Sequence, residues 1–351
     1  MMSTAESPID ATLIGTAPAA GSVTPLADGR LSVRTDEGLE LHDAGTFLSG
    51  TLAPTRSLRL PPYCAAAPLP GGSAVVAEGS RIRALGADGA TRWELSHARW
   101  HGAHRDPRPP GRPAVSPDGT LVSVLVPTPT RDERAAILIC DNPPRHRYGR
   151  DTLLLLDAAT GDIRARRPIG AVSSDVTQRW HPDGSLLALS CWTAWYSWST
   201  WWIEPRKDGL HIRGGTTMRE VIDFLPDQGR VLTLRRAEGI AHNDDRDELA
   251  SHDVAADDPA GLFDLGELAA DRDSDEVAGA FLIDADHVLV TGRIYLPGRP
   301  VSIRHWLCDT ATLRPLGRLR YPVAVGGDVT PLGDGSWLTR DRERLHHWAL
   351  P

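Results

Sequence analysis

Three histidines have the spacing that most resembles a known metal site. In the stretch HARWHGAH, His97, His101 and His104 are separated by four and three residues. On a helix they would share one face, and imidazole nitrogens arranged in this way can bind zinc. The prolines that follow leave room for a short helix at most, and Asp106 is the one nearby carboxylate. We therefore expect an arginine- and histidine-rich surface loop here and no metal site.

Other catalytic or cofactor patterns are missing from the sequence. The acidic stretch HNDDRDE (242–248) lacks the residue order of a calcium-binding loop, so a solvated loop is the better interpretation. The chain has no nucleophile elbow, no phosphate-binding loop and no dinucleotide-binding glycine motif. The sequence therefore predicts neither catalytic residues nor a bound cofactor.

Composition narrows the class of protein further. The 351 residues are 41% hydrophobic and 24% charged, which is typical of a folded chain. The formal charge of −8 disfavours general nucleic-acid binding, which needs a basic surface. The sequence has no apolar run of membrane-spanning length, and its N-terminus does not read as a secretion signal. We expect a cytoplasmic protein that binds neither nucleic acid nor membranes.

The cysteines point to the same compartment. They are far apart in the sequence and form no C-x-x-C pair, so we expect buried, reduced thiols and not disulfides or zinc ligands. The four are Cys64, Cys140, Cys191 and Cys308.

A turn motif built from proline, aspartate and glycine recurs along the chain at intervals of roughly 43 to 65 residues. Proline fixes one backbone angle, aspartate bonds back to the backbone and glycine supplies positive φ, so each copy predicts a tight turn before a strand. The copies are PLADGRLSV (25–33), PLPGGSAVV (68–76), VSPDGTLVSV (115–124), WHPDGSLLAL (180–189), LPDQGRVLTL (225–234), LIDADHVLVT (282–291) and PLGDGSWLT (331–339).

A second turn motif alternates with the first. Its seven copies are LELHDAGT (39–46), IRALGADGAT (82–91), LLLLDAATGD (153–162), WWIEPRKDG (201–209), ELASHDVAAD (248–257), HWLCDTATL (305–313) and RLHHWAL (344–350). Each pair of motifs delimits about four short strands, and 33 glycines and 28 prolines suit the many turns between them. A repeat of this length and content predicts the blade of a propeller.

These motifs resemble the repeats of WD40-like and YVTN-like β-propellers. The resemblance is carried by SPDG (116–119), by HPDG (181–184) and by LLLLDAATGDIRARRPIG (153–170), while ALGADGATRWEL (84–95) leans toward the quinoprotein-like variant. The units have neither a preceding Gly-His nor a final Trp-Asp, so no subfamily is identified. The resemblance covers nearly the whole chain and implies an all-β, seven-bladed β-propeller.

The strand order predicts how the ring closes. We name the strands of each blade a to d from the inside outward. The seventh unit ends after its strand c, so we expect the segment 11–17 to supply strand d and remove an exposed edge. Residues 1–10 are expected to form a flexible N-terminus. The single propeller would have blades at roughly 20–56, 62–98, 112–170, 174–217, 219–267, 277–320 and 323–351.

The long insertions are expected on a single face. In this strand order the a–b and c–d turns lie on one side, the short-loop face, and the b–c and d–a connections lie on the other, the long-loop face. Loops on a rigid scaffold are where binding residues concentrate. All five insertions belong to the long-loop face, namely 96–113, 127–151, 192–198, 237–247 and 266–276.

Aromatic and arginine side chains in these insertions are the candidate contact residues, because Trp, Tyr and Arg dominate protein interfaces. Trp180, Trp192, Trp201 and Trp202 fall in predicted strands, and we expect them to pack between blades. Aromatic residues at the hairpin tip could bind a partner or form a lid over the channel mouth. The candidates are Trp195, Tyr196, Arg145, Arg147, Tyr148, Trp100 and Arg105.

Charge is distributed unevenly over the predicted long-loop face. Residues 99–112 and 145–150 together carry seven arginines and one aspartate, whereas residues 242–276 carry thirteen acidic and two basic residues. Such a dipole could orient a bound partner, although ordinary solvated loops would account for the same charges.

Two functions fit these observations. The first is a non-catalytic scaffold that binds a protein or peptide through the long-loop face. The alternative is an enzyme or small-ligand binder that uses the axial pocket, with metal assistance from the histidine cluster. The fold alone does not decide between them, and the missing catalytic motifs favour the scaffold.

Overall fold

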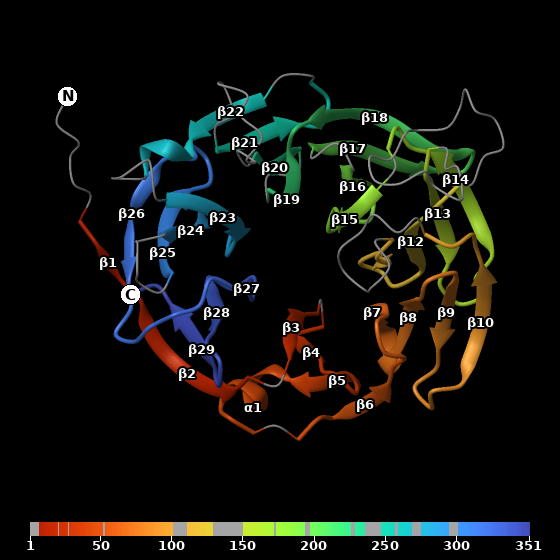
Figure 1. Cartoon of the computed structure of the whole chain (residues 1–351), viewed down its shortest axis with the longest axis horizontal. Coiled ribbons are helices and arrows are strands. Elements are labelled where there is room, and N and C mark those ends of the chain that lie inside the picture. The colour runs from red at the N-terminus through yellow and green to blue at the C-terminus, as the bar shows by residue number, and fades with distance from the viewer. Residues whose placement is uncertain are drawn as a thin grey trace.

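The computed structural model places seven β-sheets around a central axis (Figure 1). Four strands of each sheet run antiparallel in chain order, apart from the last blade, which borrows an N-terminal strand. The expected all-β, seven-bladed β-propeller is thus confirmed. The structure describes residues 7–19, 21–26, 28–51, 53–100, 111–128, 150–171, 173–193, 197–225, 229–235, 247–256, 259–268, 275–294 and 301–351.

Each blade contributes one strand to each of four concentric positions (Figure 1). The inner a strands are β3 (Ser22–Pro25), β7 (Ala65–Leu69), β11 (Ala114–Val115), β15 (Ser173–Trp180), β19 (Glu220–Phe224), β23 (Asp275–Leu282) and β27 (Val329–Pro331). The b strands are β4 (Arg30–Arg34), β8 (Ser73–Ala77), β12 (Leu121–Val126), β16 (Leu187–Thr193), β20 (Arg230–Arg235), β24 (His287–Ile294) and β28 (Ser336–Arg340).

The two outer positions follow the same order. The c strands are β5 (Gly38–Asp43), β9 (Arg81–Leu85), β13 (Thr152–Asp157), β17 (Ser197–Arg206), β21 (Glu248–Asp253), β25 (Ser302–Asp309) and β29 (Arg344–Ala349). The outer d strands are β6 (Arg56–Arg59), β10 (Thr91–Ser96), β14 (Ile163–Pro168), β18 (Gly209–Thr217), β22 (Pro259–Asp264), β26 (Pro315–Arg320) and β2 (Thr12–Pro18). Two short 3-10 helices, η1 (Pro70–Gly72) and η2 (Leu265–Glu267), lie between strands.

Aspartate and glycine form the a–b turns as the motif predicts. In blade four, Gly184 has a φ of 76° and donates its N–H to the carbonyl of His181 at 2.8 Å. The Asp183 carboxylate accepts the N–H of Ser185 at 2.8 Å. Hydrogen bonds from Ser185 lower the pKa of Asp183 to about 2. Four other aspartates of the a–b turns accept the N–H two residues ahead in the same way, namely Asp28, Asp118, Asp284 and Asp334.

Apolar side chains gather in seven clusters, one at each interface between neighbouring blades. Side chains alternate along a strand, so each blade presents one apolar row to each neighbour. In blade four, Trp180 and Trp201 pack against the cluster shared with blade three, and Trp202 belongs to the cluster shared with blade five. The expectation that these three tryptophans pack between blades is confirmed.

The N-terminal segment closes the ring as expected. β2 pairs antiparallel with β29, from Thr12 opposite Ala349 to Pro18 opposite Arg344. It thereby becomes the d strand of blade seven (Figure 1). Ala17 is buried in the cluster between blades seven and one, so the segment adds packing as well as hydrogen bonds.

Part of the expected flexible N-terminus is in fact a strand. β1 (Ile9–Asp10) pairs parallel with β26, which gives blade six a fifth strand. Asp10 and Arg320 form a bidentate ion pair with two bonds of 2.7 Å, and this pair lowers the pKa of Asp10. The chain entering β2 must cross the edge of blade six, and that edge offers unpaired backbone groups to Ile9 and Asp10.

One connection on the short-loop face is longer than expected. Between β5 and β6 the chain forms the helix α1 (Ala44–Leu48), which begins at Asp43, whose carboxylate accepts the N–H of Thr46 at 2.9 Å. Phe47 has no exposed surface and fills the cluster between blades seven and one. The helix is therefore retained by burial of one aromatic ring. Within the described ranges, no helix has the length and apolar character needed to cross a bilayer.

Deletion of residues 1–18 tests ring closure. We expect the midpoint of thermal unfolding to fall by about 10 °C or more, because the β29 edge and the apolar cluster beside it lose their cover. Deletion of residues 1–6 is the matched control and should leave the midpoint within about 2 °C of wild type. Equal midpoints for the two deletions, measured by circular dichroism, would show that β2 does not hold the ring together.

Candidate functional site

The two faces of the propeller differ in the length of their connections. On the long-loop face, residues 97–113 join β10 to β11 and residues 127–151 join β12 to β13. Most a–b and c–d turns on the short-loop face are tight, like the one between β17 and β18. The long connections on the first face agree with the expectation from sequence.

Most of the predicted contact residues lie outside the described residues. These are Trp195, Tyr196, Arg145, Arg147, Tyr148 and Arg105. Trp100 is described, is partly buried and packs against the cluster between blades three and four. Its indole lies edge-on to the His97 ring at 6.4 Å. A role for Trp100 in partner contact stays a prediction.

The histidine motif is only partly described. Nδ1 of His97 lies 2.7 Å from the carbonyl oxygen of Ala98, and burial lowers the pKa of this imidazole. His101 and His104 lie outside the described residues. Across the described ranges, no group of three or more histidine, cysteine or acidic side chains is arranged to hold a metal ion.

Two tryptophans support the hairpin tip of blade four. Trp192 on β16 and Trp198 on β17 are directly opposite each other in the strand pairing, and their rings lie 5.5 Å apart. Trp198 is 7% exposed. Aromatic cross-strand pairs stabilise hairpins. The pair flanks residues 194–196, where Trp195 and Tyr196 were predicted to bind a partner.

Exposed apolar side chains on the long-loop face were missed by the sequence analysis. The described part of the chain has eight large apolar side chains that are exposed to solvent. Four lie on the outer strands β2, β22 and β26. The other four all lie in b–c or d–a connections, and they are Tyr63, Met218, Val301 and Val323. The four residues therefore share one face of the ring and lie in four separate connections.

Two of these residues also have an unfavourable backbone conformation. Tyr63 and Met218 have φ of 56° and 61°, in the left-handed region that disfavours residues other than glycine. A third such residue, Leu313, is fully buried in the cluster between blades five and six, so packing explains it. Tyr63 is 67% exposed, and its conformation has no comparable compensation from burial.

The axial cavity is lined by the inner strands of the first four blades and by residues of β4 and β5 in blade one. Its volume is about 420 Å³, and its wall includes Arg34, Arg112 and Arg179. Cys64 also lines it, and burial raises the pKa of that thiol. Arg112 forms an ion pair with Asp175 at 3.1 Å. The cavity can therefore accept a polar ligand in contact with guanidinium groups.

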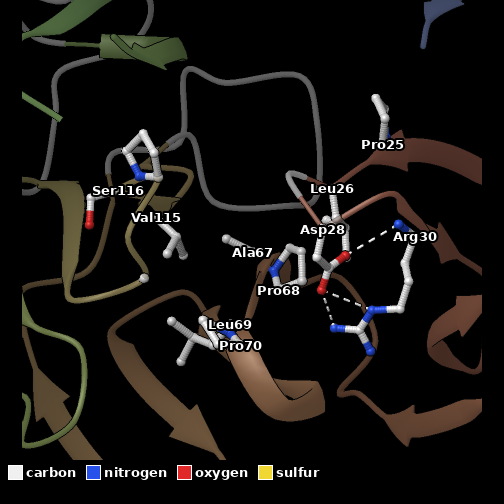
Figure 2. Close-up of a pocket in the computed structure, with 12 residues that line it drawn as sticks. Pro25, Leu26, Asp28, Arg30, Ala67, Pro68, Leu69, Pro70, Val115 and Ser116 are labelled. Carbon is white, nitrogen blue, oxygen red and sulfur yellow. Dashed lines mark hydrogen bonds and ion pairs between the residues drawn. The ribbon is translucent and has the colours of Figure 1, made fainter. Parts of the chain in front are cut away.

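A second cavity of about 380 Å³ lies at the short-loop end of the inner strands of blades one to three (Figure 2). It meets the axial cavity at Ala67 and Pro68, which line both. Its wall is largely apolar and rich in proline from the a–b turns. The charged groups at its rim, Asp28 and Arg30, are paired with each other, with bonds of 2.9 and 2.5 Å (Figure 2).

Asp151 is a buried acid at the junction of blades three and four. Its Oδ2 accepts the N–H of Ser173 at 2.7 Å, and its backbone bonds to Ile169 and Ala171. Its Oδ1 is buried without a hydrogen-bond partner. Burial raises the pKa of this carboxyl to about 7, and burial also raises the pKa of the neighbouring Cys191 thiol. Asp151 has no exposed surface, so it links the two blades and cannot reach a substrate.

The cysteines agree with their predicted role where they are described. Cys64, Cys191 and Cys308 are buried and form no disulfide among the described residues, and Cys140 lies outside those residues.

Comparison with known proteins supports the fold. No family model matches the chain, and no curated protein is similar to it in sequence. The β-propeller domain of Cps50 (Swd1) from Myceliophteria thermophila has a TM-score of 0.55 at 11% identity, covering 97% of this chain and 100% of that one. BamB from Moraxella catarrhalis has a TM-score of 0.52 at 12% identity, covering 94% and 85%. BBS1N, solved in complex with ARL6DN, has a TM-score of 0.54 at 12% identity, covering 98% of both chains.

The likeness to these structures, at 12% identity or less, shows the fold alone. The chain is a seven-bladed β-propeller. This fold agrees with the resemblance of its motifs to WD40-like and YVTN-like repeats, and no subfamily is identified.

Substitution of Asp151 by asparagine tests the buried acid. Because the pKa is higher in the folded chain, the folded state holds the proton more tightly, and wild-type stability falls as pH rises from about 4 to about 7. Asp151→Asn removes this titration. Between pH 5 and pH 8, wild type should therefore lose roughly 3 kcal/mol of stability relative to the variant, as measured by urea titrations at each pH. Asp88→Asn is the control, because hydrogen bonds lower the pKa of that exposed carboxyl and it stays ionised throughout.

Substitution of Tyr63 by glycine tests whether its backbone strain serves the fold. Relief of the left-handed conformation, worth about 1–2 kcal/mol, should offset the entropy cost of glycine, so stability should be unchanged or slightly higher. Leu313→Gly has the same backbone relief but empties a buried site, and it should lose about 2–5 kcal/mol. If urea unfolding showed both variants destabilised alike, the Tyr63 ring would have a packing role.

Proposed function

We propose that this propeller is a non-catalytic scaffold that binds a protein or peptide partner through its long-loop face. The observation that carries the proposal is the position of the exposed apolar side chains. In the described part of the chain, every one that is not on an outer strand lies on this face. The short-loop face has none among the same residues.

Three further observations support the proposal. Tyr63 and Met218 keep strained backbone conformations while exposed, and strain of this kind concentrates at functional sites. The rings of Trp192 and Trp198 contact each other on the two strands that flank residues 194–196, where Trp195 and Tyr196 are predicted to contact the partner. The solved structure of BBS1N, which has the same fold, is a complex with the protein ARL6DN.

The chemistry of the surface narrows the class of partner. Exposed apolar side chains, on a face whose connections are rich in arginine in the sequence, suit a protein surface or peptide, because Trp, Tyr and Arg are the side chains that supply most interface energy. The net charge of −8 disfavours nucleic acid. Because the described cysteines are buried and form no disulfide with one another, we propose that the protein acts in the cytoplasm.

A comparative capture experiment in the native host tests this function. The first bait is wild type, the second carries Tyr63→Ser and Val323→Ser, and the third carries Trp195→Ala, Tyr196→Ala and Arg147→Ala. We expect one protein to be captured by wild type and depleted by both face variants. With that partner purified, its dissociation constant should rise at least about tenfold for each variant, the usual effect of removing interface anchors.

Leu262→Ser with Leu316→Ser is the matched control. These two side chains are 54% and 44% exposed, against 67% and 43% for Tyr63 and Val323, but they lie on outer strands. The control should bind the partner like wild type. A partner lost by the control as readily as by the face variants, or retained by all baits, would contradict a binding role for the long-loop face.

A further inference from the structure

The wall of the axial cavity has a charge opposite to that of the chain. The protein carries a net charge of −8, yet the described residues that line this cavity include three arginines and no aspartate or glutamate. The other polar residues of its wall are Ser22, Thr24, Ser32, Thr177 and Gln178. A volume of about 420 Å³ lies within the usual size range of small-ligand sites.

In the described part of the chain, Arg34 is the one of the three arginines with a buried nitrogen that has no hydrogen-bond partner. Its Nη2 donates to the Sγ of Cys64 at 3.4 Å, and its Nη1 is buried without a hydrogen-bond partner. Among the residues that the structure describes, it forms no ion pair. Glu78, whose charge also acts on Cys64, is already paired with Arg81 and Arg83. A partly buried cation without a counter-charge is costly, and a bound anion would remove that cost.

The other two arginines are held in place by groups outside the cavity wall. Arg112 pairs with Asp175 at 3.1 Å, with both side chains nearly half exposed. Arg179 donates to the carbonyl of Ile222 at 3.0 Å, and its charge opposes the burial that raises the pKa of Asp223. Fixed guanidinium groups suit oxyanions, because the planar fork matches the geometry of carboxylate and phosphate oxygens.

Gln178 supplies a second unused polar group in the wall. It is 8% exposed, its Nε2 donates to the carbonyl of Arg112 at 2.5 Å, and its Oε1 is buried without a partner. Buried amide oxygens are normally hydrogen-bonded. Because an amide oxygen accepts only from a donor, a ligand that also satisfies Gln178 must carry an O–H group in addition to its anionic oxygens, as hydrogen phosphate and citrate do.

We propose that the axial cavity is a binding site for a small oxyanion, of the carboxylate or phosphate type, with Arg34 as its principal cationic contact. The site is separate from the long-loop surface and does not depend on any protein partner. Arg34 lies at the long-loop end of β4, so the anion would enter from that side of the ring.

Calorimetric titration of the full chain with inorganic phosphate, and separately with citrate, tests the proposal at constant ionic strength maintained with sodium chloride. We expect saturable binding of at least one probe in the millimolar range or tighter. Arg34→Gln should weaken it at least about tenfold, the effect of losing a charge-assisted hydrogen bond. Arg34→Lys keeps the charge but loses the planar fork, so it should have an intermediate affinity.

Arg92→Gln is the matched control, because Arg92 is a 57% exposed arginine paired with Asp88 on an outer strand. It should bind both probes like wild type. Arg34→Lys also serves if Arg34→Gln proves unstable by circular dichroism. The proposal is overturned if neither probe binds, or if phosphate or citrate binds equally to wild type and both Arg34 variants.

Discussion

Each blade is a four-stranded sheet that must cover both of its faces with neighbouring blades, and the rest of the structure depends on this packing. The seven apolar clusters lie between blades and not within them. An open ring would therefore expose two apolar faces and two strand edges at once. Pairing of β2 with β29 prevents this, because Ala17 and Trp348 then contribute to the clusters on either side of blade seven.

Packing between sheets also determines where polar groups can be buried. A Ser or Thr hydroxyl lies in the b strand of six blades, at Ser32, Ser123, Ser190, Thr233, Thr291 and Thr339, each 3% exposed or less. In blade four, Ser190 lies 2.6 Å from Thr200 and accepts the N–H of Val221, and Thr200 donates to the carbonyl of Arg219. This chain of hydrogen bonds joins blade four to blade five. The blades are thus connected by directed polar bonds as well as by apolar contact, which makes the ring a rigid support for its loops.

The sequence predicted the features that depend on local turn chemistry and failed where tertiary contact decides. Asp-Gly turns specify their own geometry, so the seven blades and the closing strand could be placed in advance. Pairing of Ile9 and Asp10 with β26 could not, because two residues have no periodicity. Asp151 is the last residue of the predicted insertion 127–151, yet it is fully buried. The exposure of Tyr63 and the unpaired state of Arg34 depend on neighbours that are distant in the sequence.

The same turn chemistry explains why recognition belongs to one face. Turn aspartates on the short-loop face, such as Asp118 and Asp183, accept hydrogen bonds from backbone N–H groups of their own turns. The prolines beside them set backbone angles and line an apolar pocket whose rim charges, Asp28 and Arg30, neutralise each other. Substitution of these side chains would therefore weaken the turns. The connections of the opposite face carry no such requirement, so an exposed Tyr63 there is compatible with the fold. Arg34 ends its strand on that side as well, which places the free charge of the cavity and the exposed apolar groups at the same end of the ring.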